Sequence, residues 1–413
     1  MGETGAVRQF SIRDTFVSLK YPNYRLWFIG QLVSLVGTWT QTTAQGYLIY
    51  ELTKSPAFLG YASFANGLPS LFFTLYAGAI ADRVPRRTLM VITQASMLVL
   101  AFILAALAFT HTIQWWHILI LTFLLGISNA FDAPARQAFV LEMVAREDMT
   151  NAIALNSTMF NSALVLGPAF GGLIYAWVGP GWCFTINGIS FFAVIIALLL
   201  MRLKPFVPVP SSGDTLADVR EGMRYVMSNR AVRNLIIDMF IFSIFGFGFV
   251  TLLPAWAVAV LGGDATTNGF LQAARGFGSL IGALTVAAMG RINFRGKIWT
   301  INSFLLPIMM VIFAYMRSLI PSLVAIAAGG FATMMVLNVT NAMIQSRIAD
   351  EMRGRVMGIY TFFFFGAFPL SSLVAGWAAD KFGEPITVVV SAGVLMVFAL
   401  WVLWRQPGLR AME

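Results

Sequence analysis

The sequence predicts an all-α polytopic membrane protein with about twelve transmembrane helices. Its 413 residues are 58% hydrophobic and only 11% charged, with a mean hydropathy of +0.78. Soluble domains carry roughly a quarter charged residues, so this chain could not cover a soluble surface. The apolar residues also occur in blocks that, as helices, cross a hydrocarbon core of ~30 Å. We therefore expect the chain to lie in a bilayer.

The apolar blocks define twelve candidate spans. They are too long for barrel strands and lack the two-residue alternation of such strands. No cleavable signal peptide is expected, because the chain is polar and basic through Arg25 and its first apolar block is too long. The predicted spans are residues 26–49, 57–80, 88–110, 115–137, 152–178, 182–203, 234–260, 267–290, 298–316, 321–345, 355–379 and 385–404.

The basic residues predict the orientation. With both termini in the cytoplasm, 23 of the 27 lysine and arginine residues fall on the cytoplasmic side, the exceptions being Lys54, Arg275, Arg317 and Lys381. One missed helix would invert half of the loops and destroy this bias. The pattern predicts a multi-pass protein of the cell inner (plasma) membrane, and it explains the net charge of +9 without a nucleic-acid partner.

The longest loop divides the chain into two six-helix halves, residues 1–203 and 234–413, joined by a cytoplasmic linker at 204–233. Apolar residues recur at helical spacing in the linker, at Leu216, Val219, Met223 and Val226. This spacing is typical of an amphipathic helix on the membrane face, and a plain linker helix is the alternative.

The two halves also resemble each other. A shift of 204 positions places Gly172 on Gly376 and Gly179 on Gly383, in the fifth and eleventh spans. These are equivalent positions of a six-plus-six duplication, in which substrate sites lie between the repeats near the bilayer midplane.

The loop between the second and third spans carries the most specific motif. Residues 78–87 read Gly-Ala-Ile-Ala-Asp-Arg-Val-Pro-Arg-Arg, which resembles the major facilitator superfamily signature G-x-x-x-D-[RK]-x-G-[RK]-[RK]. Pro85 replaces the second glycine and still permits a tight turn. Gly78 allows close helix approach, and Asp82 can meet the free N–H groups of a helix N-terminus.

The resemblance implies that this loop is a conformational latch. In the family its partner is the eleventh helix, which here begins near Gly354 and Gly358, and the contact breaks when the cytoplasmic side opens. A basic turn that only sets topology is the alternative. The implied latch residues are Gly78, Asp82, Arg83, Arg86, Arg87, Asp132, Arg136 and Gly358.

Asp132 and Arg136 join this set from the fourth span. They lie four residues apart on one helix face, with the acid N-terminal, which is a favourable pairing distance. The family resemblance adds Asp132 as a partner of Arg86. A local structural pair with Arg136 is the alternative.

Several further segments resemble the branch of the superfamily that includes macrolide-efflux proteins and the enterobactin exporter. They are Tyr24 to Leu26, Ser34 to Trp39, Glu51 to Pro56, Pro134 to Phe139 and Asn151 to Asn156. In the fifth span, Gly167, Pro168, Gly171 and Gly172 are similar to the family's antiporter motif, where small residues pack against the other half.

This resemblance implies a secondary active transporter. The implied function is proton-coupled export of amphipathic small molecules by alternating access, by a monomer. A dedicated exporter of one metabolite, such as a siderophore or a lipid-like compound, is the alternative.

Polar residues inside the spans predict the substrate cavity. Gln31, Ser34, Thr38 and Gln45 share one face of the first span, and such groups are costly against lipid. A role in hydrogen bonds between helices is the alternative. The second span adds Asn66, and the tenth adds Asn338 and Asn341.

Ionisable residues within spans are functional candidates. Arg275, in the eighth span, could bind an anionic substrate group or balance an acid, and snorkelling to the outer face is the alternative. A proton-driven antiporter also needs an acid, for which the candidates are Asp238, Asp132 and Glu51. We expect Asp238 about one turn into the seventh span, near the interface.

The sequence lacks the residues that other classes of function would require. The single Cys183 and two histidines provide no disulfide and no metal site. Residues 290–297 do not match the phosphate-loop pattern G-x-x-x-x-G-K-[ST], because no serine or threonine follows Lys297. No acids, histidines or nucleophiles cluster near one membrane face. We therefore expect no enzyme activity, no metal and no cofactor.

Overall fold

The computed structural model describes residues 16–140, 142–203, 215–289, 294–406 and 408, and around Gly78 and Asp82 only the backbone is described. Within these ranges the chain forms helices and no strands, which confirms the all-α class. The long helices are α2 (Pro22–Thr53), α3 (Pro56–Arg83), α4 (Arg86–Phe109), α5 (Trp115–Val140), α6 (Met149–Val178), α7 (Pro180–Leu200), α9 (Arg230–Thr251), α11 (Ala265–Met289), α12 (Arg295–Tyr315), α13 (Leu319–Gln345), α14 (Arg353–Phe382) and α15 (Glu384–Arg405).

Membrane-crossing potential differs among these helices. In the described part of the chain, ten helices are long and apolar enough to cross a membrane, and α2 and α3 are not among them. Both are nevertheless of sufficient length, with 32 and 28 residues. The polytopic class is confirmed, and ten of the predicted crossings are supported by composition.

Helix boundaries extend beyond the predicted spans because polar capping turns are invisible to hydropathy. Asn229 caps α9 by accepting hydrogen bonds from the N–H groups of Ala231 and Val232, both at 3.2 Å. The helix therefore begins at Arg230, not at residue 234. Asp238 consequently lies more than two turns inside the helix and is fully buried. Asp238 thus lies about one turn deeper in its helix than predicted, and its position near the interface stays a prediction.

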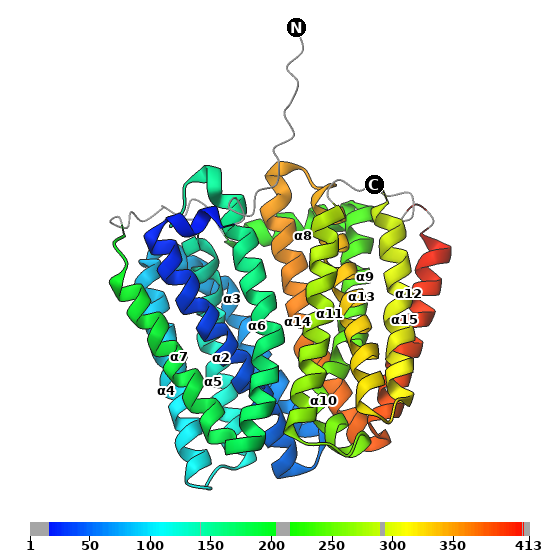
Figure 1. Cartoon of the computed structure of the whole chain (residues 1–413). Helices are drawn as coiled ribbons and strands as arrows, with labels where there is room; N and C mark the ends of the chain where they lie inside the picture. The colour runs from blue at the N-terminus through cyan, green and yellow to red at the C-terminus, as the bar shows by residue number, and fades with distance from the viewer. Residues whose placement is uncertain (1–15, 141, 204–214, 290–293, 407, 409–413) are drawn as a thin grey trace.

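The helices form two bundles, which Figure 1 shows side by side. The first bundle contains α2–α7, and α2 packs on α6 and α7 while α4 packs on α5 and α7. The second bundle contains α9–α15, where α13 packs on α11 and α12 and α9 packs on α14. The largest apolar core lies wholly in residues 226–402 of the second bundle and its linker helix.

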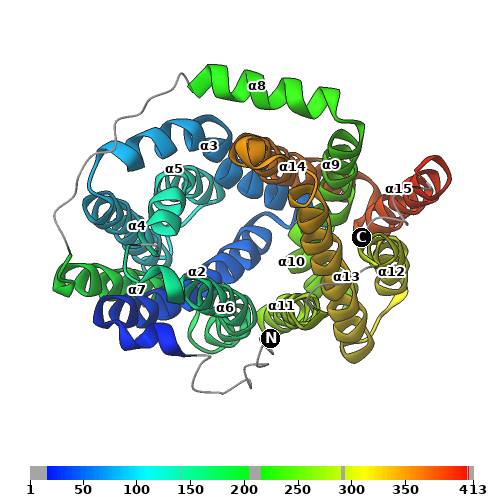
Figure 2. The ribbon, with the colours of Figure 1, turned by 90° about the horizontal axis from the view of Figure 1, so that it is seen from above.

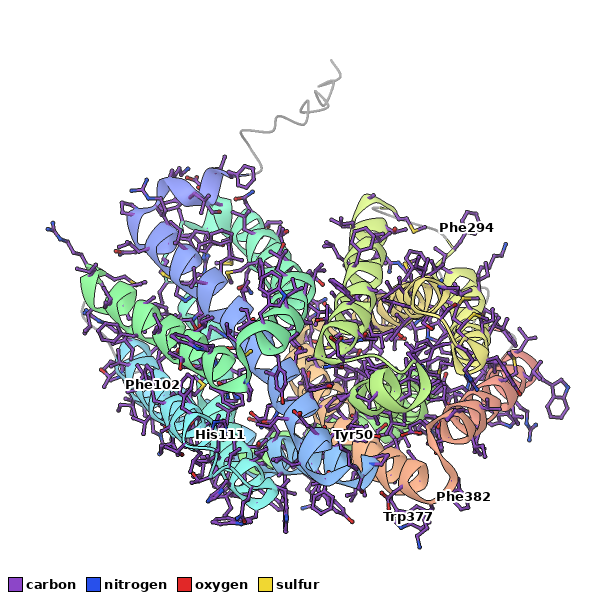
Figure 3. All side chains as sticks on the ribbon, turned by 60° about the horizontal axis from the view of Figure 1, so that its bottom comes forward. Tyr50, Phe102, His111, Phe294, Trp377 and Phe382 are labelled. Carbon is purple, nitrogen blue, oxygen red and sulfur yellow. The ribbon has the colours of Figure 1, made fainter. Side chains whose placement is uncertain are left out.

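The two ends of the bundles differ. We call the end at which α2 begins and α15 ends the terminal face, which is uppermost in Figure 1, and the other end the opposite face. Figure 3 turns the opposite face forward and shows Tyr50 between the bundles, with Trp377 and Phe382 at the edge of the second. Trp377 and Phe382 are 51% and 58% exposed, as in an aromatic belt at a membrane–water interface.

Helix α8 (Thr215–Ser228) lies at the terminal face, and Figure 2 shows it crossing outside α3 and α14. Arg355 of α14 forms ion pairs with Asp218 at 2.6 Å and with Glu221 at 3.0 Å. The Tyr225 hydroxyl accepts a hydrogen bond from the Ala349 N–H at 3.4 Å, and Val226 is buried in the second core. Helix α8 is therefore fastened to the second bundle. The domain boundary within 204–233 stays a prediction, since residues 204–214 lie outside the described part.

The start of the described chain is fastened to the first bundle. The Asp148 carboxylate accepts a hydrogen bond from the Tyr21 hydroxyl at 2.7 Å and pairs with Lys20 at 2.6 Å. Because these bonds favour the protonated forms, they raise the pKa of Lys20 and of Tyr21 above their ordinary values. This cluster links the turn Val17–Lys20 to the start of α6.

Candidate functional site

Two helix pairs make most of the contacts between the bundles, α3 with α14 and α6 with α11. In the first pair, a Cβ on Gly60 would lie 2.6 Å from the Ser372 carbonyl oxygen and 3.3 Å from the Gly376 Cα. In the second, a Cβ on Gly172 would lie 2.6 Å from the Ala265 carbonyl oxygen and 2.9 Å from the Gly269 Cα. These close backbone contacts, which we call the glycine seam, require residues without a side chain.

The predicted packing residues of α6 divide between two partners. A Cβ on Gly269 would lie 2.6 Å from the Pro168 carbonyl oxygen, so Pro168 and Gly172 both face α11 of the other bundle. Gly171 faces α2 of its own bundle, where its Cβ would lie 2.8 Å from the Thr40 carbonyl oxygen. Gly167 likewise faces α2, beside Trp39.

Hydrogen bonds add to the seam near the opposite face. The Ser55 hydroxyl, just before α3, donates to Asp380 of α14. The Asn268 side-chain amide of α11 donates to the Thr43 carbonyl oxygen of α2 at 3.4 Å. Both bonds, like the Gly60 and Gly172 contacts, lie in the half of the bundles that is nearer the opposite face. The bundles are therefore held together toward that face.

The predicted latch lies at the terminal face, where Gly78 and Asp82 fall outside the described side chains. Arg83 is exposed and Arg86 pairs with Glu142 of the same bundle. Arg87 donates to the Leu199 carbonyl oxygen at 2.7 Å. On α14, Gly354 and Gly358 are exposed, and a Cβ at either would meet no heavy atom of the described residues within 4 Å.

Asp132 is the centre of a buried polar cluster in α5 and is 2% exposed. Its carboxylate accepts hydrogen bonds from the Thr93 hydroxyl at 2.9 Å and the Gln94 amide at 3.2 Å. Its pair with Arg136 is longer, at 3.8 Å. The described partners of Asp132 thus lie on α4 and α5.

The polar stripe of α2 bonds mainly within the first bundle. The Thr38 hydroxyl lies 3.5 Å from the Asn187 Oδ1 of α7, and Gln45 donates to Thr122 of α5. Gln31 and Ser34 are buried, and the Gln31 Nε2 has no hydrogen-bond partner among the described residues. For Thr38 and Gln45, these bonds match the alternative of hydrogen bonds between helices.

The other predicted cavity residues lie on two helices that are not adjacent in sequence. Asn66 is exposed near the middle of α3. Asn338 and Asn341 are half-buried on α13, and Asn341 accepts a hydrogen bond from Gln345 one turn later.

Arg275 lies inside the second bundle, near the middle of α11. It is half-buried, and its Nε is buried with no hydrogen-bond partner among the described residues. None of the ion pairs found in the described part of the chain includes it. The side chain lines a small cavity with Phe247 and Val250 of α9 and Gly330 and Thr333 of α13.

Sequence analysis missed that Arg275 belongs to a polar stripe. Asn268, Gln272 and Ser279 precede or follow it at intervals of four, three and four residues, which is one face of a helix. Gln272 donates to the Asn268 side chain at 3.2 Å, and Ser279 donates to the Gly330 carbonyl oxygen at 3.3 Å. The spacing rule applied to α2 would also have identified this stripe.

The two other candidate acids lie at different ends. The Asp238 Oδ1 accepts a hydrogen bond from the Gln406 side chain at 3.3 Å, and its buried Oδ2 has no partner among the described residues. Glu51 is exposed at the opposite face and accepts a hydrogen bond from the Tyr175 hydroxyl. In the described part of the chain, no three histidine, cysteine or acidic side chains could share a metal ion.

Comparisons with known proteins agree along the whole chain. A family described as "Transmembrane secretion effector" matches residues 13–413. The staphyloferrin A transporter of Staphylococcus aureus is 24% identical over 87% of this chain and 90% of its own length. Macrolide efflux protein A of Streptococcus pyogenes is 23% identical, covering 92% and 96%. The multidrug efflux pump Tap of Mycobacterium tuberculosis is 27% identical, covering 92% and 93%.

Solved structures share the fold at low sequence identity. A point mutant of the nucleoside transporter NupG superposes with a TM-score of 0.76 at 10% identity, covering 93% of this chain and all of that one. A bacterial homologue of the lysosomal transporter Spinster, in an inward-facing and unoccupied conformation, gives 0.72 at 13% identity, covering 97% and 98%.

Proposed function

We propose, from the premise that this chain belongs to the transmembrane secretion effector family of major facilitator transporters, that it exports amphipathic small molecules. The chain is a multi-pass membrane transporter and not an enzyme. We further propose that it works by alternating access, that export is coupled to protons, and that the monomer is the working unit.

The glycine seam is the observation that supports alternating access. Two bundles joined by backbone contacts toward one end can rock about that end, because glycine contacts leave no interlocked side chains. The basic residues predict that the terminal face is cytoplasmic. In that orientation the seam closes the outer side, and the substrate enters from the cytoplasm.

Buried acids support proton coupling. Asp238 is fully buried on α9 and Asp132 is 2% exposed on α5, and only Asp132 has an arginine partner among the described residues. Burial without a paired cation disfavours the charged form of a carboxylate, so such a group can take up a proton and release it when its surroundings change. We therefore place Asp238 first among the coupling candidates, ahead of Asp132 and the exposed Glu51.

A dedicated exporter of one metabolite is the second candidate. Arg275 is half-buried within the bundle, and its buried Nε has no hydrogen-bond partner among the described residues, which favours a substrate with a defined charged group. One relative is named as the transporter of staphyloferrin A, and others are named for macrolides or several drugs.

Efflux from proteoliposomes tests the proposed function. The full chain would be reconstituted with a macrolide, a lipophilic dye or a catecholate siderophore, with and without an imposed proton gradient, and protein-free liposomes would serve as the control. We expect gradient-dependent movement of at least one compound. Movement that ignores the gradient would contradict proton coupling, and movement of the siderophore alone would favour the dedicated exporter.

A further inference from the structure

We propose that Arg275 recognises an anionic group on the transported molecule, so that the substrates are amphipathic anions such as carboxylates or phosphate esters. The inference rests on the proposed export function and adds to it the chemical class of the substrate. Two observations support the inference. Arg275 is a cation inside the bundle without a described partner, and the space beside it has a suitable shape and lining.

The position of Arg275 leaves its charge without compensation. It follows the start of α11 by ten residues, about 15 Å of helix, and precedes the end by fourteen, about 21 Å. A guanidinium stays protonated in proteins, and a charge at this depth in the membrane is destabilising unless an anion compensates it. Since no described side chain pairs with it, a ligand anion is the missing partner.

Snorkelling does not explain this side chain. Arg275 lines a small cavity together with residues of α9 and α13, and its own carbonyl oxygen lies directly against Gly330 of α13. The Arg275 side chain therefore faces a space between three helices of the second bundle.

The lining next to Arg275 suits the apolar part of an amphiphile. A second cavity shares Phe247 and Thr333 with the first. It continues toward the terminal face between Met239 and Phe242 of α9 and Val336 of α13. Thr333 is its one polar lining residue, and that hydroxyl is already bonded to the Gly329 carbonyl oxygen at 2.8 Å.

Together the two cavities indicate how a bound ligand would be oriented. The anionic group would lie at Arg275 and the apolar chain would extend toward the terminal face. Each cavity holds about 10 Å³, roughly one water molecule, so entry of the ligand requires the Phe247 side chain to move.

Binding of a matched series of probes tests the inference. The probes are a fluorescent dansyl-labelled dodecanoate, its primary amide and the corresponding amine, which differ only in the charge of one end. Affinity would be measured for the full chain in lipid nanodiscs, with empty nanodiscs subtracted. We expect the carboxylate to bind at least about tenfold more tightly than the amide, because the amide leaves Arg275 unpaired.

Variants assign the preference to one residue. In Arg275→Gln the ratio of carboxylate to amide affinity should fall to about one with the amide affinity unchanged, and Arg275→Lys should keep part of the preference. Arg317→Gln is the matched control, because Arg317 lies at the opposite face and donates only to backbone carbonyl oxygens, at 2.7 and 3.0 Å, among the described residues. It should leave the ratio unchanged.

Equal affinity of the wild type for carboxylate and amide would overturn the inference even if Arg275→Gln failed to fold. A full preference in a folded Arg275→Gln variant would overturn it as well. Export from proteoliposomes separates this inference from the function on which it rests. Export without a preference for anions would refute only the inference, and a preference lost with Arg275 but without any export would refute only the exporter.

Discussion

Asp132 has its described bonds within the first bundle, and its surroundings predict a structural contribution. The carboxylate accepts hydrogen bonds from Thr93 and Gln94. Its truncation leaves the buried Gln94 amide without this acceptor, whereas Thr93 can still donate to the Met90 carbonyl oxygen at 3.0 Å. We expect Asp132→Ala to lower the free energy of unfolding by about 1–3 kcal/mol, measured as reduced thermal stability in detergent.

A second aspartate that pairs with an arginine, but at an exposed position, provides the control for this variant. Asp350 pairs with Arg353 at 2.6 Å, but its side chain is 82% exposed. Asp350→Ala should therefore cost less than about 1 kcal/mol. An equal loss of stability in both variants would show that burial of the Asp132 cluster does not stabilise the fold.

At the scale of residues, sequence spacing predicted partners on the same helix and missed those on other helices. The separation of four residues predicted that Asp132 and Arg136 lie near each other, and they do, at 3.8 Å. Thr93 could not be predicted, because it belongs to α4 and its approach depends on how two helices pack. Likewise, spacing placed Thr38 and Gln45 on one face of α2 without indicating which neighbours that face meets.

At the scale of elements, hydropathy located the long helices and left their ends uncertain. Apolar blocks define the part of a helix inside the hydrocarbon, whereas the first and last turns are polar and are set by caps. The four-residue extension of α9 at Asn229 places Asp238 more than two turns inside the helix, where one turn was predicted, and the side chain is fully buried in the protein. An error of one turn in a boundary thus altered the interpretation of a candidate site.

The ion pairs of helix α8 predict how strongly this helix is held to the second bundle. Arg355 holds α8 through Asp218 and Glu221, and these side chains are 34%, 46% and 54% exposed. Since each exposed pair contributes up to about 1 kcal/mol, Arg355→Gln should speed amide hydrogen exchange throughout α8 by about threefold to tenfold. High salt should have the same effect on the wild type and little further effect on the variant.

The neighbouring Arg353 supplies the control for that experiment. It pairs with Asp350 on its own side of the loop and makes no described contact with α8. Arg353→Gln should leave exchange in α8 unchanged. If both variants accelerate exchange equally, the ion pairs of Arg355 do not fasten the helix.

At the scale of the whole molecule, the internal repeat anticipated part of the interface between the bundles. The shift that aligned Gly172 with Gly376 matched two glycines that both lie in the glycine seam. The conformation could not be predicted in the same way. A transporter sequence must fit more than one arrangement of its bundles, and the same small residues serve each of them.

The last prediction concerns the change between conformations. The exposed Gly358 of α14 has no described heavy atom near its Cβ position, and the proposed latch would bring the start of this helix toward the end of α3. We expect Gly358→Leu to fold normally, and even to gain up to about 1 kcal/mol of helix propensity. Its transport rate should fall at least about tenfold, because the leucine side chain blocks that approach. Gly393→Leu on α15 is the matched control, since Gly393 also has no heavy atom near its Cβ position and lies outside the helices that join the bundles. Transport at the wild-type rate in a stable Gly358→Leu variant would mean that α14 and α3 do not close together at the terminal face during the cycle.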